Sequence, residues 1–164
     1  MDDIVKQAMA KWPNVPHCYG WLGLDERGEW YMRDDRVQAL GGFKEACLRG
    51  DKAAKGSRLT HEKLIAFIER NYLSETDAAG TERWFFQNGP QRVYVDLAAT
   101  PYIFRVSEHF SIHTNTGLNA IYQACEMDDA GRVYLKTNLG LGLVHTQDVH
   151  LVADALEQGL WKLT

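Results

Sequence analysis

The sequence predicts an α+β fold in which a mostly antiparallel sheet, built from repeated β-hairpin motifs, packs with about three helices. Two observations favour this fold class. Segments that combine Asp or Asn with Gly recur between runs of aromatic and β-branched residues, as turns do between the strands of hairpins. Apolar residues recur at helical spacing near the start, in the middle and near the end of the chain. Strands that follow one another between helices, rather than alternating with them, are typical of α+β proteins.

The first expected element is a short amphipathic helix over residues 2–11. Its apolar residues fall on one face, and Asp2 or Asp3 can cap its amino end. The helix ends before Pro13, because the residue before a proline is pushed out of the helical conformation. An apolar run over residues 19–24 then predicts a strand.

A hairpin template recurs along the chain. Residues 24–33 and 127–136 match position by position, since each has an apolar residue, Asp, two further residues, Gly and a bulky strand that ends in a cation. Residues 77–80 form a looser third copy. Asp starts such a turn, and Gly supplies the left-handed conformation that closes it. The copies indicate either a duplicated element or the independent use of a common turn.

Asn and Gly also recur after extended segments, which predicts further chain reversals at 86–89, 114–117 and 137–140. After the first of these, the alternation over residues 91–97 predicts a strand whose exposed face carries Arg92, Tyr94 and Asp96. Pro101 restricts the following strand to an edge or to a start beyond the proline.

Two further amphipathic helices are expected, over residues 61–73 and 147–158. Their amino ends can be capped by Thr60 and Thr146. Residues 34–57 show no clear period beyond a small helix around residues 44–48.

Size and composition are those of an ordinary globular protein. The chain has 164 residues, of which 45% are hydrophobic and 11% aromatic. A chain of this length buries roughly 68–70% of the surface that it exposes when unfolded, which gives a core without metals or disulfides. We therefore expect a single domain over residues 1–164, or two structurally similar halves, about 1–75 and 76–164, that share a core.

Charge and cysteine content narrow the function classes. Lys and Arg number 18 against 22 Asp and Glu, which gives a net charge of −4, whereas nucleic-acid binders normally carry a basic excess. One basic run, residues 49–58, is rich in Gly and Ala and indicates a solvated loop. The three cysteines have no Cys-x-x-Cys spacing, and neither a signal peptide nor a membrane span is recognisable. We expect a soluble cytoplasmic protein that binds neither nucleic acid nor membranes.

Several of these segments resemble an uncharacterised bacterial family, domain of unknown function 1285. The matching segments are the Gly-x-Trp strand, the helix end, two aromatic strands and two later segments, at 28–30, 67–73, 84–86, 90–95, 96–102 and 110–117. The resemblance covers roughly residues 20–150 as a pattern rather than as close identity. It implies an α+β fold with repeated motifs and a ligand-sensing or signalling role, and it carries over no catalytic residue because none is established for the family.

Some features depart from that family. The basic run over residues 49–58 lengthens the approach to the second helix, and Arg92 stands where a Glu-Lys pair often occurs. The opening Cys-Tyr-Gly-Trp-Leu-Gly-Leu, residues 18–24, is similar to that of a group of uncharacterised proteobacterial proteins. Membership of that group implies no function.

Histidines and cysteines are the residues most able to carry a reaction. His109 and His113 are four apart in a segment that reads as extended, which places both side chains on one side. They are the candidate metal ligands, but a zinc site needs at least three converging protein ligands, so we expect no metal and no cofactor. Cys18 and Cys125 lie in apolar runs, where a thiol is usually inert.

The aromatic residues favour a binding surface. In pairs such as Trp30-Tyr31 and Trp84-Phe85 the two rings point to opposite faces of the sheet, so one ring enters the core and the other faces a helix, a partner or a ligand. A ligand groove is expected where exposed side chains of the strands meet the Asn turns and the last helix, at Arg92, Tyr94, Arg105, Asn138 and His145. Guanidinium groups beside aromatic faces suit a small anionic or planar ligand.

Three functions follow from these residues, in decreasing order of support. The first is a non-enzymatic small-ligand-binding or regulatory module, with no assigned catalytic residue. The second is a structural or self-association protein that forms homo-oligomers through exposed aromatic sheet faces and strand edges. The third is a hydrolase-like enzyme that uses His109, His113 or His145.

Overall fold

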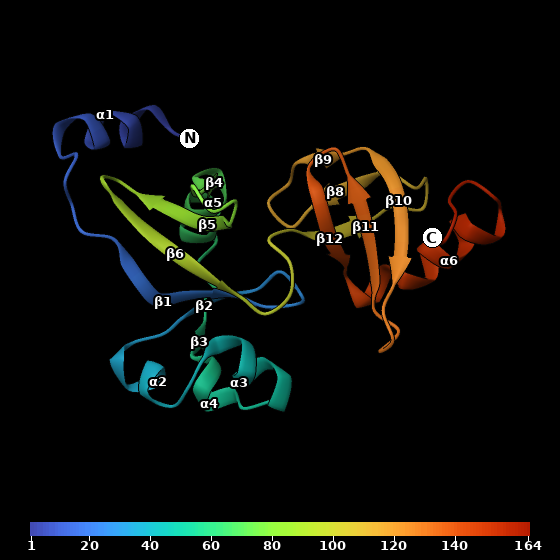
Figure 1. Cartoon of the computed structure of the whole chain (residues 1–164), viewed down its shortest axis with the longest axis horizontal. Helices are drawn as coiled ribbons and strands as arrows, with labels where there is room; N and C mark the ends of the chain where they lie inside the picture. Colours follow the sequence, from blue (N-terminus) through green and yellow to red (C-terminus); the bar gives the residue numbers. More distant parts are fainter. The chain divides into compact units, whose positions relative to one another are not determined.

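The computed structural model describes residues 1–164 and has the predicted α+β class (Figure 1). It contains six α-helices and two six-stranded sheets of mostly antiparallel strands. The chain divides into two compact units: unit 1 comprises Met1–Asp25 and Glu29–Ala98, and unit 2 comprises Glu26–Gly28 and Ala99–Thr164. The predicted sharing of one core by two similar halves stays a prediction.

Unit 1 holds one sheet and five helices. In sheet order its strands are β3 (Ser57–Arg58), β2 (Trp30–Met32), β1 (Cys18–Leu24), β6 (Gln91–Leu97), β5 (Glu82–Asn88) and β4 (Tyr72–Thr76). Neighbouring strands are antiparallel except for the central pair, β1 and β6. The helices are α1 (Asp3–Lys11), α2 (Asp35–Ala39), α3 (Phe43–Arg49), α4 (Lys52–Lys55) and α5 (Glu62–Arg70).

Unit 2 holds the second sheet and one α-helix. In sheet order its strands are β10 (Tyr122–Met127), β11 (Val133–Thr137), β12 (Gly140–Val144), β7 (Ile103–Val106), β8 (Ile112–Thr114) and β9 (Asn119–Ala120). Here too the central pair, β12 and β7, is parallel and the others are antiparallel. A 3₁₀ turn, η1 (Thr146–Asp148), leads into α6 (Val149–Glu157).

The two sheets share one strand arrangement. Each consists of two three-stranded meanders, and the first strand of the first meander pairs in parallel with the last strand of the second. Strands β1 to β6 of unit 1 therefore correspond, in chain order, to β7 to β12 of unit 2. Helices α2 to α5 lie between β2 and β4 in unit 1, whereas β8, β9 and β10 follow one another in unit 2 without a helix.

One turn geometry joins strands at five places. The first residue donates its backbone N–H to the carbonyl of the residue four positions later, and its side-chain oxygen accepts the N–H of that same residue. The fourth residue has a positive φ. The first residues of these turns are Asp25, Asp77, Ser107, Thr114 and Asp128. The predicted Asp-x-x-Gly turns are confirmed, and Ser and Thr start two more because their hydroxyls accept the same bonds.

The turns also explain the match between residues 24–33 and 127–136. The β1–β2 connection occupies the place of β7–β8 in the shared arrangement, and the β10–β11 connection occupies the place of β4–β5. The two matching segments are therefore not equivalent positions of the two units. Their similarity follows from the turn that they share.

Two predicted helix caps are wrong by one residue. The Nδ1 atom of His61 accepts the backbone N–H of Leu64 at 3.3 Å, and the Nδ1 atom of His145 accepts that of Gln147 at 3.1 Å. An imidazole nitrogen thus does at each site what a threonine hydroxyl does elsewhere. At the first helix, where Asp2 or Asp3 is the expected cap, Asp2 occupies the N-cap position but makes no side-chain capping bond.

Two predicted spans also need correction. The helix expected over residues 61–73 ends at Arg70, because the chain continues as strand β4 from Tyr72. Tyr72 is buried as part of the sheet and not as part of the helix. The basic run 49–58 is not a continuous loop, since it contains α4 and β3. The side chain of Asp51 caps α4 by accepting the N–H of Ala54 at 3.2 Å, which stabilises a helix of a single turn.

The two faces of the unit 1 sheet have different neighbours. Trp30 donates its Nε1–H to Glu69 of α5 at 3.3 Å, whereas the ring of the next residue, Tyr31, lies 5.7 Å from the ring of Phe43 in α3. The expected opposition of consecutive aromatic rings is confirmed for this pair, and Figure 1 shows α5 and α2–α4 as separate groups. On the α5 side the core includes Leu22, Leu24, Ile68, Phe86, Val93 and Val95, and α3 and α4 add the buried residues Phe43, Ala46 and Ala54. Burying each of the larger side chains among these stabilises the fold by roughly 1.5–3 kcal/mol.

Candidate functional site

The predicted exposed face of residues 91–97 lies on β6, on the same side of the sheet as α3. Val93 and Val95 are buried in the core, while Arg92, Tyr94 and Asp96 are each partly exposed. Because side chains alternate along β6, Arg92, Tyr94 and Asp96 form one row on this face, with successive Cα atoms of the row about 7 Å apart. The candidate site is built around this row.

The first member of the row, Arg92, is held by an acidic partner. Its Nη1 atom pairs with Glu75 of β4, and its guanidinium lies 4.3 Å from the ring centre of Phe85. The hydroxyl of Tyr94 donates to the other oxygen of Glu75 at 2.9 Å. Hydrogen bonds from Arg92 and then from Tyr94 hold the pKa of Glu75 below its ordinary value. The carboxylate therefore fixes both side chains in place.

The second member, Tyr94, forms part of an aromatic stack. The ring of Tyr19 on β1 lies parallel to it, with ring centres 4.8 Å apart and an angle of 5° between the planes. The imidazole of His17 meets the same ring edge-on at 5.7 Å. Tyr19 is 58% exposed, so the stack stands at the surface and presents a flat apolar face.

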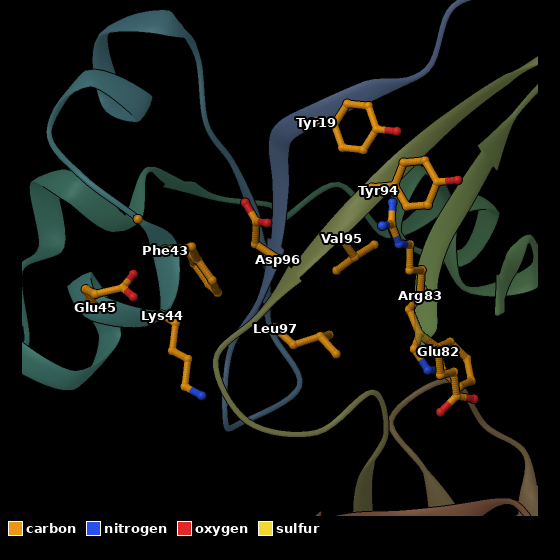
Figure 2. A pocket seen from close by; sticks show the side chains of 12 residues that line it. Tyr19, Phe43, Lys44, Glu45, Glu82, Arg83, Tyr94, Val95, Asp96 and Leu97 are labelled. Atoms are coloured by element: carbon orange, nitrogen blue, oxygen red, sulfur yellow. The ribbon is translucent and has the colours of Figure 1, made fainter. Parts of the chain in front are cut away.

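A cavity of about 450 Å³ opens next to this stack, where the sheet splits; we name it the β5–β6 cavity. Strands β5 and β6 pair only from Asn88 and Gln91 to Phe85 and Tyr94, although β5 stays paired with β4 as far as Glu82. Beyond Tyr94, backbone groups of the two strands consequently face the gap rather than each other. The lining residues are Tyr19, Gly42, Phe43, Lys44, Glu45, Glu82, Arg83, Trp84, Tyr94, Val95, Asp96 and Leu97 (Figure 2).

Figure 2 shows how the walls are made. Phe43 and Lys44 of α3 lie on one side of the cavity, Glu82 and Arg83 of β5 lie on the other, and β6 runs between them. Phe43 approaches the sheet closely because residue 23 of β1 is a glycine. A Cβ atom on Gly23 would lie 2.7 Å from the Phe43 ring.

Charged groups in the walls differ in how they are held. Burial raises the pKa of Asp96, and the guanidinium of Arg33, whose Nη1 atom lies 3.9 Å from Oδ2, partly offsets that effect. Arg83 pairs with Asp77 at 3.7 Å. Lys44 is exposed and makes no ion pair. The cavity thus combines aromatic walls with a few positively and negatively charged groups.

The other predicted site residues belong to unit 2. Arg105 forms two hydrogen bonds to Asp148, at 2.7 and 3.3 Å, and the same carboxylate accepts the N–H of Val106 at 3.0 Å. The side-chain oxygen of Asn138 accepts the N–H of Ile121 at 2.7 Å, and His145 caps η1 as described. Each of these three side chains has a structural bond within its own unit, while Arg92 and Tyr94 lie in unit 1. Their convergence on one groove stays a prediction.

The histidines expected to share one side of an extended segment do not do so. His113 lies on β8, paired with Arg105 of β7, but His109 lies in the turn that Ser107 starts and Phe110 closes with a φ of 64°. The extended assignment of residue 109 is therefore wrong, because the turn template also accepts Ser and Phe. No group of three or more His, Cys, Asp or Glu side chains is arranged to hold a metal ion.

Sequence reasoning missed most of the cavity walls. Lys44 lies at the start of the small helix expected around residues 44–48, which the structure confirms as α3, but no sequence pattern assigns Phe43 or Lys44 to a site or gives Glu75 a partner. The glycines of the segment Gly-Trp-Leu-Gly-Leu are the available signal, because Gly23 marks a place where a ring lies against the strand.

Comparison with known proteins places the fold in a class of uncharacterised α+β proteins. A DUF1285 family protein from Silicibacter pomeroyi has a similar structure, with a TM-score of 0.53 and 12% identity over 94% of this chain and 84% of that chain. A second DUF1285 family protein, from Shewanella baltica, has a TM-score of 0.47 and 13% identity over 82% of this chain and 91% of that chain. The first comparison confirms the predicted resemblance at the level of the fold.

The chain itself belongs to the family DUF2944, described as "Protein of unknown function (DUF2946)", whose profile matches residues 1–162. No curated protein matches the sequence. None of the helices combines the length and the hydropathy that crossing a bilayer requires.

Proposed function

We propose that this protein is a non-enzymatic binding or regulatory module that takes a small planar ligand in the β5–β6 cavity. The observation that supports this function is an open cavity of about 450 Å³ at a split in the sheet, lined by the rings of Tyr19, Phe43 and Tyr94. Ligand sites are typically concave, measure roughly 300–1,000 Å³ and combine apolar walls with a few polar groups.

A planar ligand fits the shape and chemistry of these walls. Aromatic rings bind other rings by offset stacking or by edge-to-face contact, and the exposed Tyr19–Tyr94 stack offers a flat surface for either. Backbone groups of β5 and β6 beyond Tyr94 would give in-plane hydrogen bonds to a heterocycle or an aromatic acid. Lys44 and Asp96 would then select the charge of its substituents.

Binding without reaction is favoured by the lining itself. No Ser, Thr, Cys or His lines the cavity, so the common pairs of nucleophile and imidazole base are absent from it. Reversible occupation of such a cavity in a small domain is typical of sensing and regulatory modules.

Two matched pairs of probes test this function. Benzoate and cyclohexanecarboxylate share a charge but differ in planarity, as do benzamidine and cyclohexanecarboxamidine. Because a ligand of the folded state raises the melting temperature in proportion to ln(1 + [L]/Kd), we expect the planar member of at least one pair to give the larger shift. Equal shifts within both pairs would show that the cavity does not select planar ligands.

A matched pair of variants locates the binding. Tyr19→Ala removes half of the aromatic stack and should abolish the shift produced by the planar probe. Trp12→Ala removes an aromatic side chain of similar exposure, 51% against 58%, that does not line the cavity, and should leave the shift intact. A planar probe that stabilises Tyr19→Ala as much as the unaltered protein would refute this location.

A further inference from the structure

A second cavity in unit 1, of about 350 Å³, shares no lining residue with the β5–β6 cavity. Its walls come from α1 and the segment after it, and from the hairpin of β5 and β6. We name it the Gln87 cavity; its lining residues are Met9, Pro13, His17, Gln87, Pro90 and Arg92. Hydrogen-bonding side chains lie on both of its walls, His17 on one and Gln87 and Arg92 on the other.

Gln87 is a buried polar side chain whose bonds are only half made. It is 1% exposed, and its Nε2 atom donates to the carbonyl of Gly89 at 2.9 Å. Its Oε1 atom has no hydrogen-bond partner. The large majority of buried side-chain polar atoms in native structures have a hydrogen-bond partner, and an exception calls for a specific explanation. A ligand that brings an O–H or N–H donor into the cavity would satisfy this oxygen.

Arg92 supplies the opposite chemistry in the same cavity. Both of its hydrogen bonds, to Glu75 and to the Tyr94 hydroxyl, use Nη1, which leaves Nε and Nη2 without partners. The contact with Phe85 and the pairing with Glu75 hold the guanidinium in one orientation. Two adjacent N–H groups of a fixed guanidinium match two oxygens of an oxyanion.

His17 lies on the facing wall. Its ring contacts Tyr94 edge-on, and no hydrogen bond occupies either imidazole nitrogen. One of these nitrogens always carries a hydrogen, so His17 can donate to a third ligand oxygen. The exposed side chain leaves the cavity open to solvent on this side.

We propose that the Gln87 cavity binds a small oxyanion that also carries an O–H donor, the chemistry of inorganic phosphate at neutral pH. Its charged oxygens would accept from Arg92 and His17, and its P–OH group would donate to Oε1 of Gln87. Because that oxygen is buried, contact requires a small rotation of the terminal amide, a torsion with a broad and shallow energy profile. Sulfate has the same shape but no proton to donate, so the unmade bond of Gln87 would select against it.

Nuclear magnetic resonance titration at neutral pH and constant ionic strength tests the proposal. We expect inorganic phosphate to shift the side-chain amide signals of Gln87 and the Nε–H signal of Arg92 saturably, and sulfate to bind at least about tenfold more weakly, as expected for an unsatisfied buried acceptor. Glycolate against acetate repeats the comparison with a hydroxy acid, and distinguishes a phosphate site from one for carboxylates that bear a hydroxyl. Equal binding of phosphate and sulfate would overturn the proposal.

Variants separate recognition from folding. Gln87→Met should bring the affinities for phosphate and sulfate together, whereas Arg92→Gln should weaken both. Arg58→Gln is the matched control, because Arg58 lies on a strand of the same sheet, pairs with a glutamate and lines neither of the two cavities. If Gln87→Met does not fold, His17→Ala changes only an exposed side chain and should lower the affinity for phosphate. Unchanged phosphate affinity in both His17→Ala and Arg92→Gln would refute the site.

Discussion

The shared turn geometry makes a quantitative prediction at Gly131, the fourth residue of the turn that Asp128 starts. Gly131 has a φ of 80°, and a Cβ atom placed on it would meet no heavy atom within 4 Å. Gly131→Ala therefore tests the backbone conformation without steric crowding. The left-handed conformation costs roughly 1–2 kcal/mol for a residue with a side chain, and the reduced entropy of the unfolded chain returns about 0.4–1 kcal/mol. We expect a net destabilisation of about 1 kcal/mol.

Gly28 provides the comparison within the same geometry. Its φ is 82°, but a Cβ atom there would lie 2.9 Å from the Cβ of Asn115. Crowding of this kind adds about 1–3 kcal/mol to the backbone strain, so Gly28→Ala should lose at least twice as much stability as Gly131→Ala. Urea unfolding followed by far-ultraviolet circular dichroism measures both, with Gly131→Asn as a control that tolerates positive φ. Equal losses in the two alanine variants would refute the reasoning.

Three further predictions concern charge and packing. Burial raises the pKa of Asp148, but its bonds to Arg105 and Val106 and the charge of Arg105 outweigh that effect and lower it. The pair thus stabilises the fold above the ordinary Asp pKa of about 3.9, and this stabilisation is lost as the pH falls through the folded pKa. Arg105→Gln should therefore destabilise the protein at neutral pH and flatten this acid dependence, as urea unfolding at several pH values would show. Burial raises the pKa of Asp96, so the folded state disfavours its charge. Asp96→Asn should raise the melting temperature at neutral pH and not below the ordinary pKa, and an equal gain at both would contradict it. Gly23→Ala places a methyl group against the Phe43 ring and should cost about 1–3 kcal/mol while weakening binding of planar probes, measured by the same thermal shifts.

Residue patterns predicted the local structure of segments better than they predicted which side chains contact one another across the sheet. Alternation placed Arg92, Tyr94 and Asp96 on one face of a strand, and turn chemistry located four of the five repeated turns, all but the one that Ser107 starts. The partner of Arg92 is Glu75, which reaches it across β5, and that neighbourhood depends on strand order rather than on any local pattern. The caps predicted at Thr60 and Thr146 were wrong for a different reason. A histidine caps each site instead, and imidazole caps are less frequent than hydroxyl or carboxylate caps.

Strand arrangement also explains where two of the cavities lie. In unit 2 the two meanders follow one another directly, whereas in unit 1 the chain inserts α2 to α5 between β2 and β4. Phe43 and Lys44, which form one wall of the β5–β6 cavity, belong to this insertion. So do Leu64, Phe67 and Ile68, which line an apolar cavity of about 330 Å³ beneath α5. A sheet of this arrangement can be completed without those helices, as unit 2 demonstrates. The inserted segment is therefore best explained by what it adds to the sheet, a concave and partly polar surface against a strand on which Glu75 already holds Arg92 and Tyr94.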